Sequence, residues 1–311
     1  MFVSTGALPA PEDVQAAVDE AYARSRDDTS GTVSDVYPAL ERVPPDLFGI
    51  CVVGTSGTTY AVGDADREFT IMSVSKPFVF ALVCERLGAA ELRSRIGVNA
   101  TGLAFNSAEA VERGVGGRTN PMVNSGAIAT TSFAPDWAFL RDGLSRFAGR
   151  ELVLDHEVYA SASATNARNQ ALARLVELGR DPAEAVDLYT RQCSLRVTAH
   201  DLAVMGATLA DGGVNPVTRE RVIDASVCHY TLAVMLTAGL YETSGEWLYD
   251  VGLPAKSGIG GGIVTVSPGK GGVGTFAPRL DTAGNSVRGQ QVARHLSSEL
   301  GMDLLISSPD G

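Results

Sequence analysis

Lysine is scarce in this sequence. Only three of its 25 basic residues are lysines, Lys76, Lys256 and Lys270, and all the others are arginines. An arginine keeps its proton in a protein, whereas a lysine held away from water can lose its proton and then serve as a base. The three lysines are therefore the first side chains to consider for chemistry, and the positions of two of them favour such a role.

Positive charge and long apolar runs are also lacking. The net charge of −11 argues against binding to nucleic acid or to an anionic membrane, because both require a basic surface. The longest apolar run, Phe78 to Cys84, is too short to span a bilayer. The N-terminus has neither a basic start nor an apolar stretch of signal-peptide length, so we expect a cytoplasmic protein.

Clustered metal ligands are missing as well. The sequence has no CxxC, and its histidines show no ligand spacing with each other or with a cysteine. The residues concerned are Cys51, Cys84, Cys193, Cys228, His156, His200, His229 and His295. We expect reduced, mostly buried thiols, no metal and no cofactor.

The pattern of apolar residues predicts strands near both ends and helices between them. Phe48–Val53 and Thr59–Val62 flank a Gly-rich turn and predict a hairpin, and Gly252–Ser257, Gly262–Ser267 and Val273–Phe276 predict further strands. Helices are predicted at Pro11–Arg26, Ser73–Leu87, Thr165–Leu178, Pro182–Gln192, Ala199–Leu209, Ser226–Thr237 and Ser286–Leu300. The prediction is an α+β fold, in which an antiparallel sheet from both chain ends is flanked by helices. Residues 1–91 and 224–311 would form this part, and residues 92–223 an inserted helical subdomain of one interlocked unit.

Ser73-Val-Ser-Lys76 begins the predicted helix that ends at Gly88. A residue and its third successor share a helix face, so Ser73 and Lys76 would lie about one turn apart. A desolvated lysine can take the serine proton, and the N–H groups of the helix terminus can hold an oxyanion. The motif is weak by itself, because Ser267-Pro-Gly-Lys270 also matches it in a turn, and Ser73 can equally be a helix cap.

Lys256-Ser257-Gly258 ends a predicted strand and strengthens the case. A Lys-Ser/Thr-Gly strand beside an SxxK helix is the pairing of penicillin-recognising enzymes. The Ile259 amide would supply the second oxyanion donor. The alternative is a Gly-rich hairpin with a solvated lysine. Two glycine patterns that suggest nucleotide binding, at 252–257 and 269–274, lack the helix that such loops require.

From about Tyr37 onward the sequence resembles the glutaminases of the serine β-lactamase-like superfamily. The matching segments, in chain order, are Gly63-Asp64, Phe69 to Lys76, Gly102 to Asn106, Asn120 to Ile128, Arg168-Asn169, Asp211 to Gly213, Gly239 to Tyr241, Ser244-Gly245, Val251 to Gly258 and Gly284 to Ser286. The resemblance implies that fold and the hydrolysis of L-glutamine to L-glutamate and ammonia.

The resemblance also implies roles for single residues. Ser73 would attack the amide with Lys76 as base, Tyr241 would relay a proton to the leaving ammonia, and the N–H groups of Ser73 and Ile259 would hold the oxyanion. Lys256 and Ser257 would form the supporting strand. The substrate would contact Tyr37, Ser73, Asn124, Asn169, Tyr189, Tyr241 and Ile259. A homodimer or homotetramer is expected by resemblance only.

One position departs from the family. An acidic residue seven positions before the Arg-Asn asparagine pairs with the substrate α-ammonium in the family, and here that position is Ala162. The Gly-Asp usual before Arg168 reads Asn166-Ala167. Three explanations for Ala162 are open: another acid takes the place of the missing one, the substrate lacks a free α-amine, or the enzyme has low activity. A related serine amidase or esterase and a non-enzymatic paralogue remain alternatives. A β-lactamase would need a Ser-x-Asn element and a deacylating acid, and neither is convincingly placed.

Overall fold

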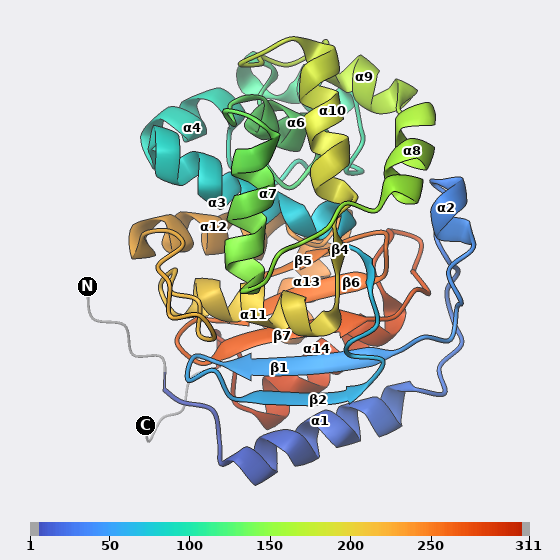
Figure 1. The fold of residues 1–311 in the computed structure, drawn as a ribbon, viewed down its shortest axis with the longest axis vertical. Coiled ribbons are helices and arrows are strands. Elements are labelled where there is room, and N and C mark those ends of the chain that lie inside the picture. Colours follow the sequence, from blue (N-terminus) through green and yellow to red (C-terminus); the bar gives the residue numbers. More distant parts are fainter. Residues whose placement is uncertain (1–5, 307–311) are drawn as a thin grey trace.

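The computed structural model describes residues 6–306, which form a five-stranded antiparallel sheet covered by helices on both faces (Figure 1). The sheet order is β2-β1-β7-β6-β5. Its strands are β1 (Gly49–Gly54), β2 (Thr59–Gly63), β5 (Ala255–Ser257), β6 (Gly262–Ser267) and β7 (Gly271–Phe276). Two chain segments more than 200 residues apart therefore meet where β1 pairs with β7, with Cys51 opposite Gly274. This confirms the predicted sheet built from both chain ends.

Alternation along the strands gives the sheet two buried faces. In β1, Ile50 and Val52 point to one face while Cys51 and Val53 point to the other. The first face is covered by α1 (Pro11–Ser25) and α14 (Val287–Glu299), which also contact each other. The second is covered by α11 (Ala199–Ala210), whose predicted cap Thr198 accepts from Asp201 N–H at 3.0 Å in a capping box.

The remaining helices form a group at the top of Figure 1, with α12 and α13 beside the sheet. Their bounds are α2 (Pro38–Glu41), α3 (Ser75–Leu87), α4 (Ala89–Ile96), α5 (Glu109–Arg113), α6 (Asn124–Ser132), α7 (Trp137–Ala148), α8 (His156–Ala164), α9 (Ala167–Ala173), α10 (Pro182–Cys193), α12 (Ala225–Ala238) and α13 (Ser244–Val251). Short 3₁₀ turns lie at Met72–Val74, Val115–Gly117 and Tyr241–Thr243. A second, two-stranded sheet pairs β3 (Phe69–Thr70) with β4 (Arg196–Val197).

The division of the chain at residues 92 and 223 stays a prediction. Within that predicted insert, α11 packs mainly on the sheet, with α7 of the upper group as a further contact. None of the helices within residues 6–306 combines the length and the apolar character that crossing a membrane requires.

Glycines let α11 lie unusually close to the sheet. A Cβ atom added at Gly274 of β7 would stand 1.9 Å from the Ala199 carbonyl oxygen, and one at Gly272 would stand 2.3 Å from the Ala203 oxygen. Any side chain there would push the helix backbone off the strand.

We therefore expect Gly274→Ala to lower the free energy of unfolding by about 3 kcal/mol, measured by urea denaturation, because overpacking cannot relax against backbone. The matched control is Gly245→Ala in α13, where an added Cβ meets nothing within 4 Å. It should be neutral or stabilising by up to about 1 kcal/mol. Equal effects of the two substitutions would contradict this account of the packing.

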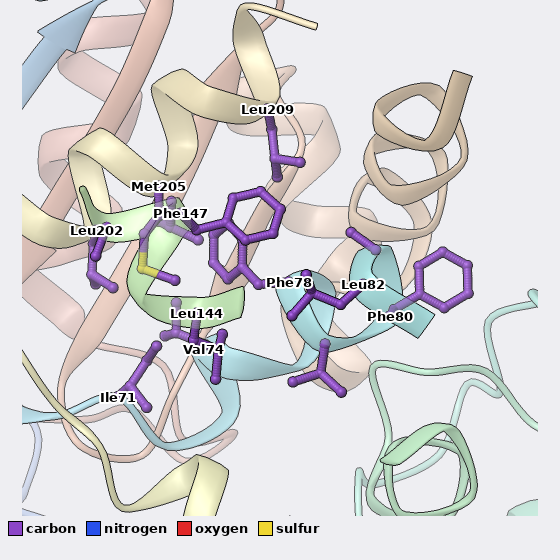
Figure 2. Packing of buried hydrophobic residues seen from close by; sticks show 14 of the residues in the cluster. Ile71, Val74, Phe78, Phe80, Leu82, Leu144, Phe147, Leu202, Met205 and Leu209 are labelled. Atoms are coloured by element: carbon purple, nitrogen blue, oxygen red, sulfur yellow. The ribbon is translucent and has the colours of Figure 1, made fainter. Parts of the chain in front are cut away.

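Packing between helices fixes the segment that leads into α3. Figure 2 shows Ile71 and Val74, on either side of Met72 and Ser73, in one cluster with Leu144 and Phe147 of α7 and with residues of α11. The rings of Phe78 and Phe147 lie 5.0 Å apart at 59°. The chain around Ser73 is thus held from its apolar side, and the polar side is left for the site.

Candidate active site

Ser73 lies in a 3₁₀ turn, Met72–Val74, and not in the first turn of an α-helix as the sequence predicts. The α-helix begins at Ser75, and Met72, at the start of the 3₁₀ turn that leads into it, has a positive φ of 47°. The Ser73 side chain is buried at 7% exposure and lines a cavity. A positive φ is energetically costly for any residue except glycine. Among the non-glycine residues of 6–306, only Met72, Arg219 and Tyr241 have a positive φ. Two of these three belong to the site.

The Lys256-Ser257-Gly258 edge lies directly against this turn. A Cβ atom added at Gly258 would stand 3.2 Å from the Ser73 backbone nitrogen and 3.1 Å from the Ile71 oxygen. Only glycine allows this approach without displacing the turn. Ile259, the next residue, lines the same cavity as Ser73. Within residues 6–306, the backbone N–H groups of Ser73 and Ile259 make no hydrogen bond to the protein, so both are available to an oxygen in the cavity.

Lys76 is fully enclosed, with 1% of its surface exposed. Its Nζ donates to the Met122 carbonyl oxygen at 3.1 Å and to Asn124 Oδ1 at 2.7 Å. Neither partner is a carboxylate. Burial therefore dominates and lowers the pKa of Lys76 to about 7, with the nearby Cys193 thiol acting weakly in the opposite direction. A neutral amine is accessible here at ordinary pH.

Lys256 and Tyr241 share one acceptor. Lys256 Nζ donates to the carbonyl oxygens of Ser257 at 2.6 Å and Gly239 at 2.9 Å, and the Tyr241 hydroxyl donates to the same Ser257 oxygen at 3.1 Å. The lysine nitrogen also lies 4.2 Å from the centre of the Tyr241 ring. Burial, and then the charge of Lys76, holds the pKa of Lys256 well below its ordinary value.

Burial likewise raises the pKa of Tyr241, and a hydrogen bond with Ser73 opposes this shift. The phenol therefore keeps its proton and lies beside the serine. A protonated hydroxyl in this place can donate to, or exchange a proton with, a group that reacts at Ser73 Oγ.

A row of amides continues from Lys76 into the cavity. Asn124 Oδ1 accepts from Lys76 and from the Tyr189 hydroxyl at 3.1 Å, and Asn124 Nδ2 donates to Asn169 Oδ1 at 3.0 Å. Asn169 Nδ2 then donates to Asn166 Oδ1 at 2.8 Å. Because each amide is oriented by the one before it, the row fixes which atoms face the cavity.

The cavity brings most of the predicted site residues together. Its volume is about 100 Å³, and Tyr37, Ser73, Asn124, Asn169, Tyr189 and Ile259 all line it. Burial raises the pKa of Tyr37 to about 12, so this phenol too stays protonated. The predicted residues that do not line the cavity are Lys76, Tyr241, Lys256 and Ser257. These four connect to the lining through the contacts described above.

Some lining residues were not predicted to act in the site. They are Val36, Met72, Phe105, Asn106, Ala162, Thr165, Asn166, Arg168, Thr190, Cys193 and Ser194. Phe105 packs on Tyr241 with ring centres 4.7 Å apart, and Asn166 extends the amide row to Thr190. Asn106 and Arg168 stand in segments that resemble the glutaminases, which was a usable signal. Asn166 stands where the sequence departs from the family's Gly-Asp, but that departure gave it no predicted role.

The second SxxK segment is a turn, as predicted. Ser267 closes β6 and donates to the Met302 oxygen at 3.1 Å, while Lys270 is remote from the cavity and contacts the Gly301 oxygen. Among residues 6–306, no three His, Cys, Asp or Glu side chains gather closely enough to hold a metal ion.

Comparison with known proteins places this arrangement in one family. A sequence profile of the family described as "Glutaminase" matches residues 31–305. "Glutaminase 2" of Yersinia pestis is 67% identical, over 99% of this chain and 94% of that protein. The solved structure of the probable glutaminase ybaS is 42% identical and superimposes with a TM-score of 0.94, covering 96% of this chain and 100% of that chain. Mglu in its glutamate form is 36% identical with a TM-score of 0.88, over 97% of this chain and 71% of that chain. The fold is the serine β-lactamase-like fold of these proteins, and the chain belongs to the glutaminase family.

Proposed function

We propose that this protein hydrolyses the side-chain amide of L-glutamine to L-glutamate and ammonia through an acyl-enzyme on Ser73. The observation that carries the proposal is the enclosed Lys76, a lysine without a carboxylate partner next to a serine turn. Its neutral amine donates its two N–H bonds to Met122 and Asn124, which leaves the lone pair for the proton of Ser73 Oγ. The names of the relatives support the same reaction.

The bond changes follow from this geometry. Ser73 Oγ forms a bond to the amide carbon while its proton passes to Lys76 Nζ, and the amide oxygen becomes an oxyanion held by the N–H groups of Ser73 and Ile259. The carbon–nitrogen bond then breaks, Tyr241 passes a proton to the leaving nitrogen, which departs as ammonia, and the proton on Lys76 passes to Tyr241, so that the amine and the phenol are both restored. Water next attacks the ester carbon and loses a proton to Lys76, which returns it to Ser73 Oγ as the ester bond breaks and glutamate leaves. Tyr37, Asn124, Asn169 and Tyr189 supply donors and acceptors for the substrate.

The pH dependence tests the base directly. Because Lys76 acts only when it is unprotonated and its pKa is about 7, kcat/KM should fall about tenfold for each pH unit below 7 and level off above it. The measurement is ammonia release from glutamine between pH 5 and 8.5. Lys270→Met, far from the cavity, should keep the same profile. A rate independent of pH across this range would contradict a lysine base.

We further propose a cytoplasmic homo-oligomer, a dimer or a tetramer. All four cysteines are buried and unpaired, which is compatible with a reducing compartment. The oligomer rests on resemblance to the family, and light scattering of the purified protein tests it. A mass of 32.5 kDa in solution, that of one chain, would contradict it.

A further inference from the structure

Among residues 6–306, no acidic side chain lines the cavity beside Ser73. None of the side chains that line it is an aspartate or a glutamate. Its one charged lining residue is Arg168, and the two lysines behind the lining, Lys76 and Lys256, donate only to uncharged oxygens. The far end of an amide bound in this cavity would contact uncharged side chains or Arg168, and no carboxylate of the lining.

Acidic residues close to the cavity along the chain are already engaged. Asp155 caps α8 and pairs with Arg196, and Asp187 accepts from the Tyr159 hydroxyl and pairs with Arg191.

Two further acids stand close to lining residues in the sequence. Glu157 pairs with Arg42. Asp35, one residue before the lining Val36, is exposed and does not line the cavity. An ammonium group held among the lining side chains would therefore lose its water without finding a carboxylate among them.

A substrate carboxylate, unlike an ammonium group, has a charged partner in the lining, Arg168. Arg168 donates its Nε to the Asn106 carbonyl oxygen at 3.0 Å and, within residues 6–306, pairs with no acid. Its remaining N–H groups suit the carboxylate of a substrate. On α8, the lining residue is Ala162, 3% exposed, whose methyl group gives the wall neither charge nor hydrogen bond.

We propose that this site prefers γ-carboxamides that carry a carboxylate and no α-ammonium, either deaminated or N-acylated, over glutamine itself. The inference rests on the proposed function, since it concerns the substrate of the same Ser73 reaction. Glutamine carries one positive and one negative charge, whereas these amides carry the negative charge alone. A wall formed by Ala162, with Arg168 as the only charged lining group, matches the second kind of substrate.

The experiment compares three amides with the full-length wild-type protein: L-glutamine, the monoamide of glutaric acid, and N-acetyl-L-glutamine. Ammonia release is measured at pH 8. We expect kcat/KM to be at least about tenfold higher for one of the last two than for glutamine, a difference of about 1.4 kcal/mol. If only the glutaric monoamide is hydrolysed faster than glutamine, the α-nitrogen must be absent from the substrate. If N-acetyl-L-glutamine is hydrolysed faster as well, the α-nitrogen need only be uncharged.

Two variants test the wall itself. Ala162→Glu should raise kcat/KM for glutamine at least tenfold, mainly through KM, and lower it for the two anionic amides. Ala162→Gln has the same length without the charge and should produce neither change. If both variants fail to fold, the wild-type comparison alone decides.

The outcomes separate the two proposals. A wild-type preference for glutamine over both other amides, or equal effects of Ala162→Glu and Ala162→Gln, would overturn this inference and leave the proposed function standing. A loss of glutamine activity in Asp35→Asn would also overturn it, because an outside carboxylate would then serve the ammonium. No ammonia from any of the three amides would overturn the proposed function, and this inference with it.

Discussion

Replacing Ser73 by alanine is expected to lower kcat by at least about 10⁴-fold while the protein stays folded. The Ser73 side chain lines the cavity together with Ile259, and these two residues carry the backbone N–H groups that make no hydrogen bond within residues 6–306, so we expect no neighbouring hydroxyl to take over the attack. The change removes one oxygen from a nearly buried position and leaves the surrounding packing of Ile71 and Val74 intact. Ammonia release and thermal unfolding are the two measurements. Residual activity within tenfold of wild type would refute a covalent route through Ser73.

The chain offers a matched control in its other SxxK segment. Ser267→Ala removes a buried hydroxyl of the same kind, whose bond to the Met302 oxygen lies away from the cavity. It should leave kcat unchanged and cost at most about 1 kcal/mol of stability. An electrophilic analogue of glutamine should label Ser73 in the wild type and in Ser267→Ala, and should label no residue in Ser73→Ala. Mass spectrometry of the labelled peptide distinguishes these outcomes.

The sheet could be predicted from the sequence because its signals are local. The Gly-rich turn between β1 and β2, and the Pro268–Gly269 turn between β6 and β7, mark hairpins whose strands pair with their own neighbours in the chain. The pairing of β1 with β7 has no local signal, and it was predicted only by assuming that the strands near the two chain ends form a single sheet. The close seating of α11 was not predictable, since it depends on Gly272 and Gly274 facing a helix more than 60 residues earlier.

The predicted helix limits failed where tertiary contacts override the local pattern. The apolar spacing predicts one helix over Thr165–Leu178, but α9 covers only Ala167–Ala173. Likewise the spacing of Ser73 and Lys76 suggested a regular α-helix. The structure has a 3₁₀ turn at Ser73, which begins at Met72 in a conformation that an L-residue rarely adopts. Strain of this kind leaves no trace in apolar periodicity.

The motifs predicted the candidate site better than they predicted the geometry that connects its parts. Ser73 and Gly258 were named from two short patterns, and their backbones lie against each other. Two amides of the row behind them, Asn124 and Asn169, stand in segments that resemble the glutaminases, but no pattern indicated that they connect to Lys76. Asn166 is joined to Lys76 only through Asn169 and Asn124, so its part appears once three helices are packed together.

Replacing Lys76 is expected to abolish activity by a different physical route. Lys76→Met keeps an unbranched side chain that is one atom shorter and cannot accept a proton, and Lys76→Arg carries a permanent positive charge because a guanidinium does not lose its proton. Both should lower kcat by about 10³-fold or more. Lys270→Met, in the second SxxK segment, should not. If Lys76→Arg retained substantial activity, the lysine would act through its charge and not as a base.

The same lysine also makes the stability of the protein depend on pH. The pKa of Lys76 is about 7 in the folded protein and about 10.5 when unfolded, so between these values only the unfolded chain binds the proton. Folding is therefore penalised as pH falls from about 10.5 to about 7, by at most about 5 kcal/mol at about 1.4 kcal/mol per pH unit, and the penalty is constant below pH 7.

Lys76→Met lacks this penalty. Its lost hydrogen bonds to Met122 and Asn124 cost the same at every pH. The urea midpoint of Lys76→Met relative to wild type should therefore be highest near pH 7 and should decline toward pH 10. A difference that does not change with pH would mean that Lys76 stays charged in the folded protein, and a charged Lys76 cannot accept the proton of Ser73.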